Sequence, residues 1–124
     1  YGIKSEYTII YIYNPDCNAC AEVTQALSNS EILGPLMDKG ILTVAAIYPD
    51  EDLALWREHL KDMPKNWVNG YNKGQTIRNG AVYDLRAIPT LYLRNSSKDV
   101  VIKDAATIPP IENYFYMNYM QKRL

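Results

Sequence analysis

The chain has 124 residues, and 48% of them are apolar, so it can form one compact domain whose core needs no disulfide framework. Lys and Arg together number 13 and Asp and Glu number 14, a balance that excludes an electrostatic binder of nucleic acid. The apolar runs are far too short for a membrane span. Tyr1 begins the chain without an initiator Met or a signal-like segment, so we expect a fragment or a mature form of a longer protein.

The first half of the chain alternates between predicted strands and helices. The aromatic and β-branched segment 7–13 is typical of a buried strand. A helix is expected from the two cysteines to about Leu27, and a shorter helical piece at 31–40 ends at Gly40. Residues 41–47 form a continuous apolar run, which is typical of a strand covered on both faces in a parallel sheet.

The second half is predicted to hold two helices, a short strand and a hairpin. In chain order, these are a helix at 52–62, a strand at 67–71, strands at 90–93 and 100–103 joined by a polar turn, and a helix from about Pro110 to Lys122 or Arg123. The segment 76–85 is ambiguous, and we favour a short helix from Gly80 to Leu85. The order of elements predicts parallel strands joined by helices, followed by an antiparallel pair. The predicted fold class is α/β, with a mixed central sheet.

The final predicted helix carries apolar side chains on two faces. Those on the face expected to join the core are Ile111, Tyr114, Phe115 and Tyr119. Those on the opposite face are Tyr116, Met117, Met120 and Leu124. Because the surface helix of a monomer should be more polar there, one hypothesis is contact with another domain of the full chain or with a second subunit. The alternative is scattered exposed tyrosines in a chain with 11 Tyr and 1 Phe.

The only two cysteines, Cys17 and Cys20, lie where the first predicted strand gives way to the first helix. Residues three apart in a first helical turn share a face, and their separation suits a disulfide. The free N–H groups and the positive end of the helix dipole favour a thiolate in this turn. We therefore expect Cys17 to be the more exposed and reactive thiol and Cys20 the more buried one. Asp16 opposes this effect, because a nearby negative charge disfavours a thiolate.

Other interpretations of the cysteine pair remain open at this point. A zinc site needs four ligands, commonly supplied as two such pairs, and this chain adds only His59, which we expect at an exposed helix position. A disulfide across two residues closes a tiny loop and stabilises little through chain entropy. Redox chemistry is the leading hypothesis. Because the chain lacks a set of four zinc ligands, we expect no metal. Because the sequence contains no flavin or nicotinamide fingerprint, we also expect no cofactor.

A second motif, Ile88-Pro89-Thr90, leads into the predicted strand at 90–93. With Cys17-Asn18-Ala19-Cys20 and the order of its elements, the chain resembles the thioredoxin superfamily over nearly its whole length, as a single domain at 1–124. It looks most like the bacterial TlpA/ResA-type thiol–disulfide oxidoreductases. The resemblance implies a three-layer α/β/α sandwich and a periplasmic or otherwise extracytoplasmic location, with or without a membrane anchor ahead of Tyr1.

The resemblance also implies a role for each residue of the two motifs. Cys17 would be the attacking thiolate and Cys20 the resolving thiol. A cis peptide bond would precede Pro89, and the backbone around Ile88 and Thr90 would hold a substrate peptide as an added strand. A proline that merely opens a strand is the alternative. The implied partners are a protein that contains a disulfide and a second protein that reduces the resulting Cys17–Cys20 bridge.

The chain departs from the family at the residues that usually handle protons. Compared with the thioredoxins that it resembles, the chain has Tyr11 in place of a buried Asp and Ala46 in place of the Lys that partners it. ResA-like proteins have a Glu where this chain has Val23, with Glu22 one place earlier. Glu22, the Tyr11 hydroxyl and water are the remaining acceptors for the proton of Cys20. The second hypothesis is therefore a redox-idle binding or adaptor module on a thioredoxin-like scaffold.

Overall fold

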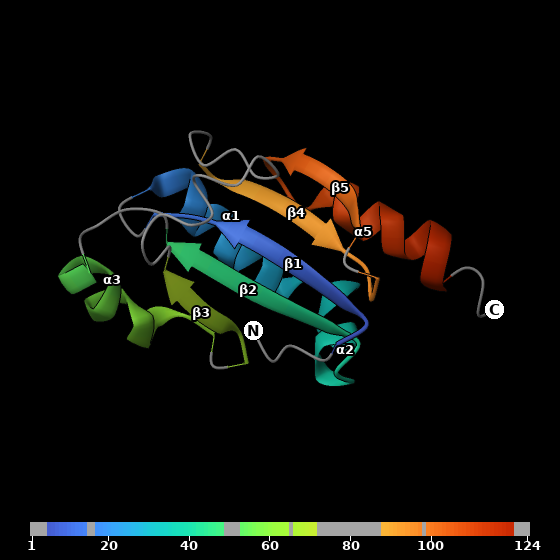
Figure 1. The fold of residues 1–124 in the computed structure, drawn as a ribbon, viewed down its shortest axis with the longest axis horizontal. Coiled ribbons are helices and arrows are strands. Elements are labelled where there is room, and N and C mark those ends of the chain that lie inside the picture. The colour runs from blue at the N-terminus through green and yellow to red at the C-terminus, as the bar shows by residue number, and fades with distance from the viewer. Residues whose placement is uncertain are drawn as a thin grey trace.

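The computed structural model describes residues 5–14, 17–48, 53–64, 66–71, 88–97 and 99–120. A five-stranded sheet in the order β3-β2-β1-β4-β5 forms its centre (Figure 1). The strands are β1 (Tyr7–Ile12), β2 (Leu42–Tyr48), β3 (Val68–Tyr71), β4 (Thr90–Arg94) and β5 (Val100–Ala105). β1 and β3 each pair in parallel with β2, whereas β4 runs antiparallel to β1 and β5. The predicted mixed sheet of an α/β fold is therefore confirmed.

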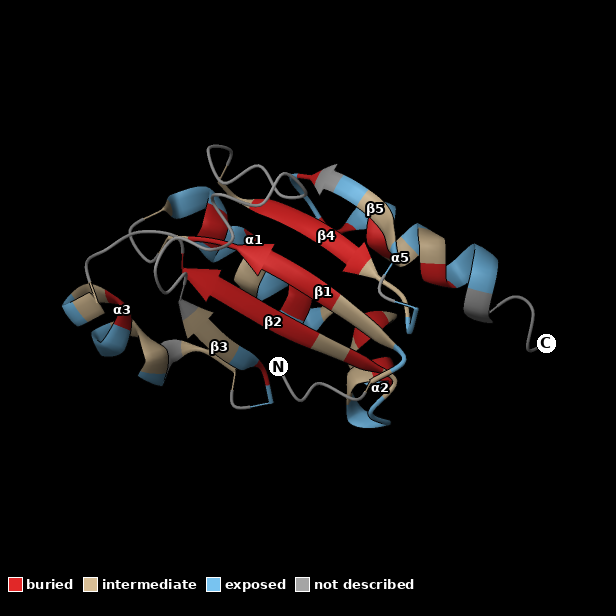
Figure 2. Cartoon of the chain, viewed as in Figure 1, coloured by how far each residue is buried: buried red, intermediate tan, exposed pale blue. Residues whose placement is uncertain are grey.

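The central strand β1 and its neighbour β2 are buried on both faces (Figure 2). Successive side chains of a strand point to opposite faces of the sheet. Accordingly, Ile9 and Tyr11 join the large core cluster beneath the helices, and Ile10 and Ile12 join a smaller cluster on the other face. The continuous apolar run of β2 has the same explanation, since Val44 and Ala46 join the large cluster and Ala45 and Ile47 join the smaller one.

The described helices contribute to the larger core cluster. They are α1 (Asn18–Asn29), α2 (Leu33–Asp38), α3 (Leu53–His59) with a 3₁₀ turn at Leu60–Asp62, and α5 (Pro109–Phe115) with a π-helical turn at Tyr116–Met120. Gly40, with a φ of 74°, follows α2, as expected for a residue that ends a helix. The buried residues that these helices supply to the cluster include Leu27, Leu36, Trp56, Ile111 and Phe115.

Some of the predictions fall on residues that the structure does not describe. These are the helix from Gly80 to Leu85, the effect of Asp16 and the end of the C-terminal helix beyond Met120. Within the described ranges, none of the helices is both long and apolar enough to cross a membrane.

Candidate active site

The cysteine pair lies at the end of the sheet where the parallel strands finish. The arrowheads of β1, β2 and β3 point to this end, and α3 lies beyond it (Figure 1). The chain leaves β1 at Ile12 and enters α1 at Asn18, so α1 begins at the same end. Open α/β sheets place their sites at the carboxyl ends of parallel strands.

Cys17 is the N-cap residue of α1. Its backbone is extended, with φ −94° and ψ 119°, and its Sγ accepts a hydrogen bond from the backbone N–H of Cys20 at 3.1 Å. The first N–H groups of a helix lack partners within the helix, so the sulfur occupies the place of a capping oxygen. The side chain is half-buried, which leaves it accessible from solvent. A partly exposed sulfur that faces a helix N-terminus is the environment of reactive cysteines.

Cys20 lies one turn further along and is buried, with 2% of its surface exposed. Burial, assisted by the neighbouring Cys17 thiol, raises the pKa of the Cys20 thiol to about 12, although the Asn14 backbone and the Tyr11 hydroxyl act in the opposite direction. Cys20 is therefore a neutral thiol near neutral pH and must lose a proton before it can attack another sulfur. Both cysteines are free thiols in the structure, and their exposures follow the predicted order.

Tyr11 occupies the position beneath α1 where the family has an acid. Its side chain is fully buried, and its hydroxyl donates a hydrogen bond to the carbonyl oxygen of Cys20 at 2.6 Å. The hydroxyl also lies 3.1 Å from Oγ1 of Thr24. Burial raises the pKa of Tyr11 well above its usual range, so the phenol is a neutral donor. Ala46 is opposite Tyr11 in the β1–β2 register, so neither position carries a charge.

Ile88, Pro89 and Thr90 lie beside the end of β1. The Ile88–Pro89 peptide bond is cis. Thr90 begins β4, is 2% exposed and pairs with Ile12, the last residue of β1. Ile88 is half-buried and packs against the same core cluster as Cys17. The antiparallel register of β1 and β4 thus brings the second motif to the end of the strand that leads to the cysteines.

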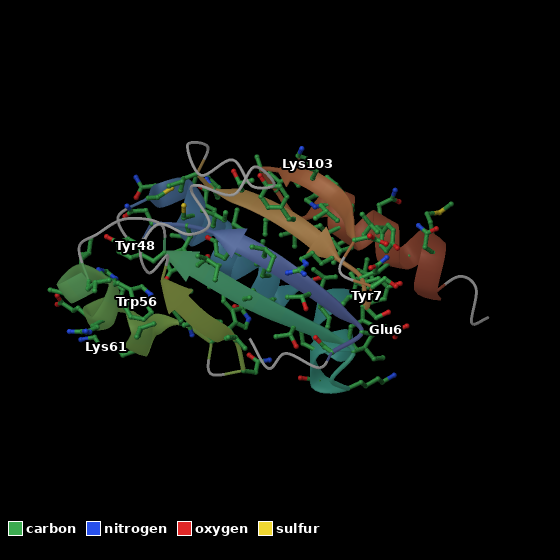
Figure 3. The ribbon with its side chains drawn as sticks, viewed as in Figure 1. Glu6, Tyr7, Tyr48, Trp56, Lys61 and Lys103 are labelled. Carbon is green, nitrogen blue, oxygen red and sulfur yellow. The ribbon has the colours of Figure 1, made fainter. Side chains whose placement is uncertain are left out.

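The structure also brings His59 to the site. A cavity of about 180 Å³ is lined by Cys20 and His59, together with Tyr13, Asn14, Thr24 and Met63. His59 is half-buried, so the prediction of an exposed position was wrong. Trp56, three residues earlier in α3, is buried in the core cluster that includes Tyr48 (Figure 3). Residues three apart share a helix face, so the spacing of His59 from Trp56 was the signal in the sequence that indicated an inward position.

Within the described residues, no group of three or more His, Cys, Asp or Glu side chains is placed to hold a metal ion. Of the two cysteines, Cys20 lines the cavity with His59, and Cys17 does not.

Several solved structures are similar to this chain. The C-terminal domain of an uncharacterized protein from Bacteroides fragilis is 45% identical, with a TM-score of 0.87, and the match covers 94% of this chain and 82% of that one. A thioredoxin-like protein from Bacteroides caccae is also 45% identical, with a TM-score of 0.86, over 93% of this chain. This chain spans only 41% of that longer protein. No protein-family model and no curated protein matches the sequence.

More distant structures share the fold. The thioredoxin domain of a thiol-disulfide oxidoreductase from Bacteroides vulgatus has a TM-score of 0.67 at 15% identity, over 90% of this chain and 81% of that one. The chain belongs to the thioredoxin superfamily, as its two motifs indicated. The neighbours that share this fold include named thiol–disulfide oxidoreductases, at 15% and 17% identity.

Proposed function

We propose that this protein is a thiol–disulfide oxidoreductase that reduces protein disulfides through Cys17 and Cys20. The observation that carries the proposal is the arrangement of the two sulfurs at the start of α1. The half-buried Cys17 Sγ accepts the Cys20 N–H at 3.1 Å, and the Cys20 side chain is buried one turn behind it. One thiol is thus open to a substrate, and the other is protected until the first has reacted.

The reaction takes place in two exchanges. The Cys17 thiolate attacks one sulfur of a substrate disulfide, the substrate S–S bond breaks, and one substrate thiolate leaves. Cys20 then loses its proton and attacks Cys17 Sγ, which releases the second substrate sulfur and leaves a Cys17–Cys20 disulfide. The substrate has gained two electrons and the protein has lost two. A reducing partner protein returns them by the same exchange in reverse, so no cofactor is needed.

The backbone at Ile88, Pro89 and Thr90 is the proposed docking strand for the substrate. It lies at the end of β1, where Thr90 pairs with Ile12. Because the Thr90 side chain is buried, contact with a substrate there involves the main chain, as when an extended peptide adds to the edge of a sheet. Recognition of this kind accepts many sequences around a disulfide.

We further propose that the chain acts as one domain of a longer, extracytoplasmic protein. A fold neighbour from Mycobacterium tuberculosis is described as a secreted disulfide oxidoreductase. The Bacteroides fragilis relative is the C-terminal domain of its protein. Cell fractionation of the native host, with the protein detected by antibody, tests the location.

The redox midpoint of the cysteine pair tests the function. The protein is equilibrated in glutathione or dithiothreitol buffers of graded potential, and its thiols are then alkylated and counted by mass. A two-electron midpoint near −270 mV, about that of thioredoxin, supports a reductase, and one near about −120 mV supports an oxidant. The Cys20→Ser variant is the control, because it cannot close the bridge. If Cys17 is not alkylated at neutral pH, or if no bridge forms, the adaptor module replaces the enzyme.

A further inference from the structure

The cavity beside Cys20 is lined by polar groups from three parts of the chain. Tyr13 follows β1, Thr24 lies in α1, and His59 ends α3. The volume of about 180 Å³ is enough for several water molecules, each of which takes about 30 Å³ in the liquid. The side chains of Asn14, Thr24 and His59 line the cavity and carry groups that can form hydrogen bonds with water. The cavity therefore has both the size and the polar partners that ordered water needs.

The titratable groups around Cys20 differ in their ability to accept its proton. The Tyr11 hydroxyl donates a hydrogen bond to the Cys20 carbonyl oxygen, and burial raises the pKa of Tyr11 well above its usual range. Burial also raises the pKa of Tyr13 to about 12, so this phenol is neutral near neutral pH. Cys17 is covalently bound to the substrate at that stage. Glu22, on α1, is exposed to solvent.

Among the described residues, His59 is the remaining titratable group that lines the cavity with Cys20. An imidazole has an accepting nitrogen when neutral, and histidine is the residue type that exchanges protons near neutral pH. We infer that His59 accepts the proton of Cys20, through water in this cavity, when Cys20 attacks the mixed disulfide. The inference rests on the proposed function and assigns to α3 the proton transfer that a buried acid performs in the family.

The step balances as follows. A bond forms between the Cys20 and Cys17 sulfurs, and the bond between Cys17 and the substrate sulfur breaks. The electron pair of the broken bond leaves with the substrate as a thiolate. The proton of Cys20 passes by way of water to a nitrogen of His59, which then gives it to solvent or to the departing thiolate. Cys20 and Cys17 end as a disulfide, and the substrate sulfur is reduced.

The test is stopped-flow reaction of the reduced protein with the chromogenic disulfide dithiobis-nitrobenzoate. The first nitrobenzoate thiolate released reports the attack by Cys17, and the second reports the attack by Cys20. In His59→Gln we expect the second release to slow by about 100-fold near neutral pH, as for loss of a general base, with the first release unchanged. Glu58→Gln is the matched control, because it places the same residue at the neighbouring exposed position of α3 and should leave both releases unchanged.

Two further readouts separate proton transfer from a merely structural role. The pH profile of the second release should differ between the wild type and His59→Gln, in which the rate should keep rising with hydroxide. In His59→Ala, added imidazole should restore the second release, and a bulky buffer at the same pH and concentration should not. Circular dichroism verifies that each variant is folded, and His59→Asn replaces His59→Gln if that variant is not.

The inference is overturned if His59→Gln releases the second thiolate within threefold of the wild-type rate. It is also overturned if the variant is slow but keeps the wild-type pH profile and gains nothing from imidazole. A wild-type protein that gives no second release would instead refute the proposed function itself. The two failures are therefore distinguishable in one experiment.

Discussion

Tyr11 is the residue that most clearly separates this site from a typical thioredoxin. A phenol replaces the buried acid, and its hydroxyl connects β1 to α1 through the Cys20 carbonyl at 2.6 Å. A neutral group can be buried here without the desolvation cost of a carboxylate, provided that it is hydrogen-bonded. The residue therefore holds the backbone of Cys20 in place, and because it is a neutral donor it is not an acceptor for the Cys20 proton.

Removal of the Tyr11 hydroxyl should lower stability. We expect Tyr11→Phe to reduce the free energy of unfolding of the reduced protein by about 1–2 kcal/mol, because a buried hydrogen bond is lost. Urea unfolding followed by fluorescence measures the change. Tyr116→Phe is the control, since Tyr116 is 53% exposed and its variant should stay within about 0.5 kcal/mol of the wild type. Equal stabilities for all three proteins would contradict the prediction.

The raised pKa of Cys20 should make the stability of the reduced protein depend on pH. Burial raises this pKa from 9.0 to about 12 in the folded protein, so the unfolded chain loses the proton first as the pH increases. The contribution of the Cys20 thiol to the free energy of unfolding is complete below about pH 9. It is lost progressively between about pH 9 and pH 12. Urea unfolding of the wild type and of Cys20→Ala across this range should show the difference between them shrinking as pH rises. A difference that stays constant would argue against a raised pKa.

At the scale of the elements, α1 begins with a sulfur in place of the usual hydroxyl or carboxylate cap. The Cys17 Sγ accepts the Cys20 N–H at 3.1 Å, and the Cys17 carbonyl accepts the N–H of Ala21 at 3.0 Å. No acidic side chain lies in the first turn of α1 to assist the cap. The start of the helix therefore depends on the same atom that is proposed to perform the chemistry.

Substitutions at Cys17 should separate these two roles. Cys17→Ser keeps a side-chain acceptor at the N-cap, so its free energy of unfolding should be close to that of the reduced wild type. Cys17→Ala removes the acceptor and should be less stable than Cys17→Ser by about 1 kcal/mol. Both variants should lose the first thiolate release. Urea unfolding provides the stabilities, and identical values for the Ser and Ala variants would show that the cap contributes nothing.

At the scale of the whole molecule, the C-terminal helix presents different faces to the core and to solvent. Ile111 and Phe115 are fully buried, whereas Tyr116 and Met117 are 53% and 51% exposed. The hypothesis that the outer face contacts another domain or a second subunit remains a prediction. The side chains of Met120 and Leu124, which were assigned to the same face, lie outside the described part of the chain.

Solution measurements on the intact protein test this contact. If the outer face is covered, we expect either a dimer by analytical ultracentrifugation or slow oxidation of Met117 by peroxide in the full-length protein. A Met117→Gln variant should then dissociate the dimer or loosen the domain contact. A monomer whose Met117 is oxidised at the rate of a free methionine would instead leave scattered exposed tyrosines as the explanation.

The sheet was predictable because the apolar composition of its strands indicates that they are buried. The segments at 7–13 and 41–47 matched β1 and β2, since a strand covered on both faces is apolar along nearly its whole length. The proposed proton acceptor was harder to predict. Tyr11 was considered an acceptor, yet its hydroxyl donates, and this depends on the carbonyl that α1 places above it. His59 lines the cavity one turn after the buried Trp56, and that spacing was the signal of its inward position.

The capping role of Cys17 has a consequence for how the redox state can be observed. A sulfur that carries negative charge holds an N–H more strongly than a neutral sulfur does. The amide of Cys20 should therefore exchange its hydrogen with deuterated solvent at a rate that depends on whether Cys17 is a thiolate, a thiol or half of a bridge. The hydrogen bond in the first turn of α1 would then strengthen and weaken during each turnover. The exchange rate of the Cys20 amide would therefore report the redox state of the cysteine pair.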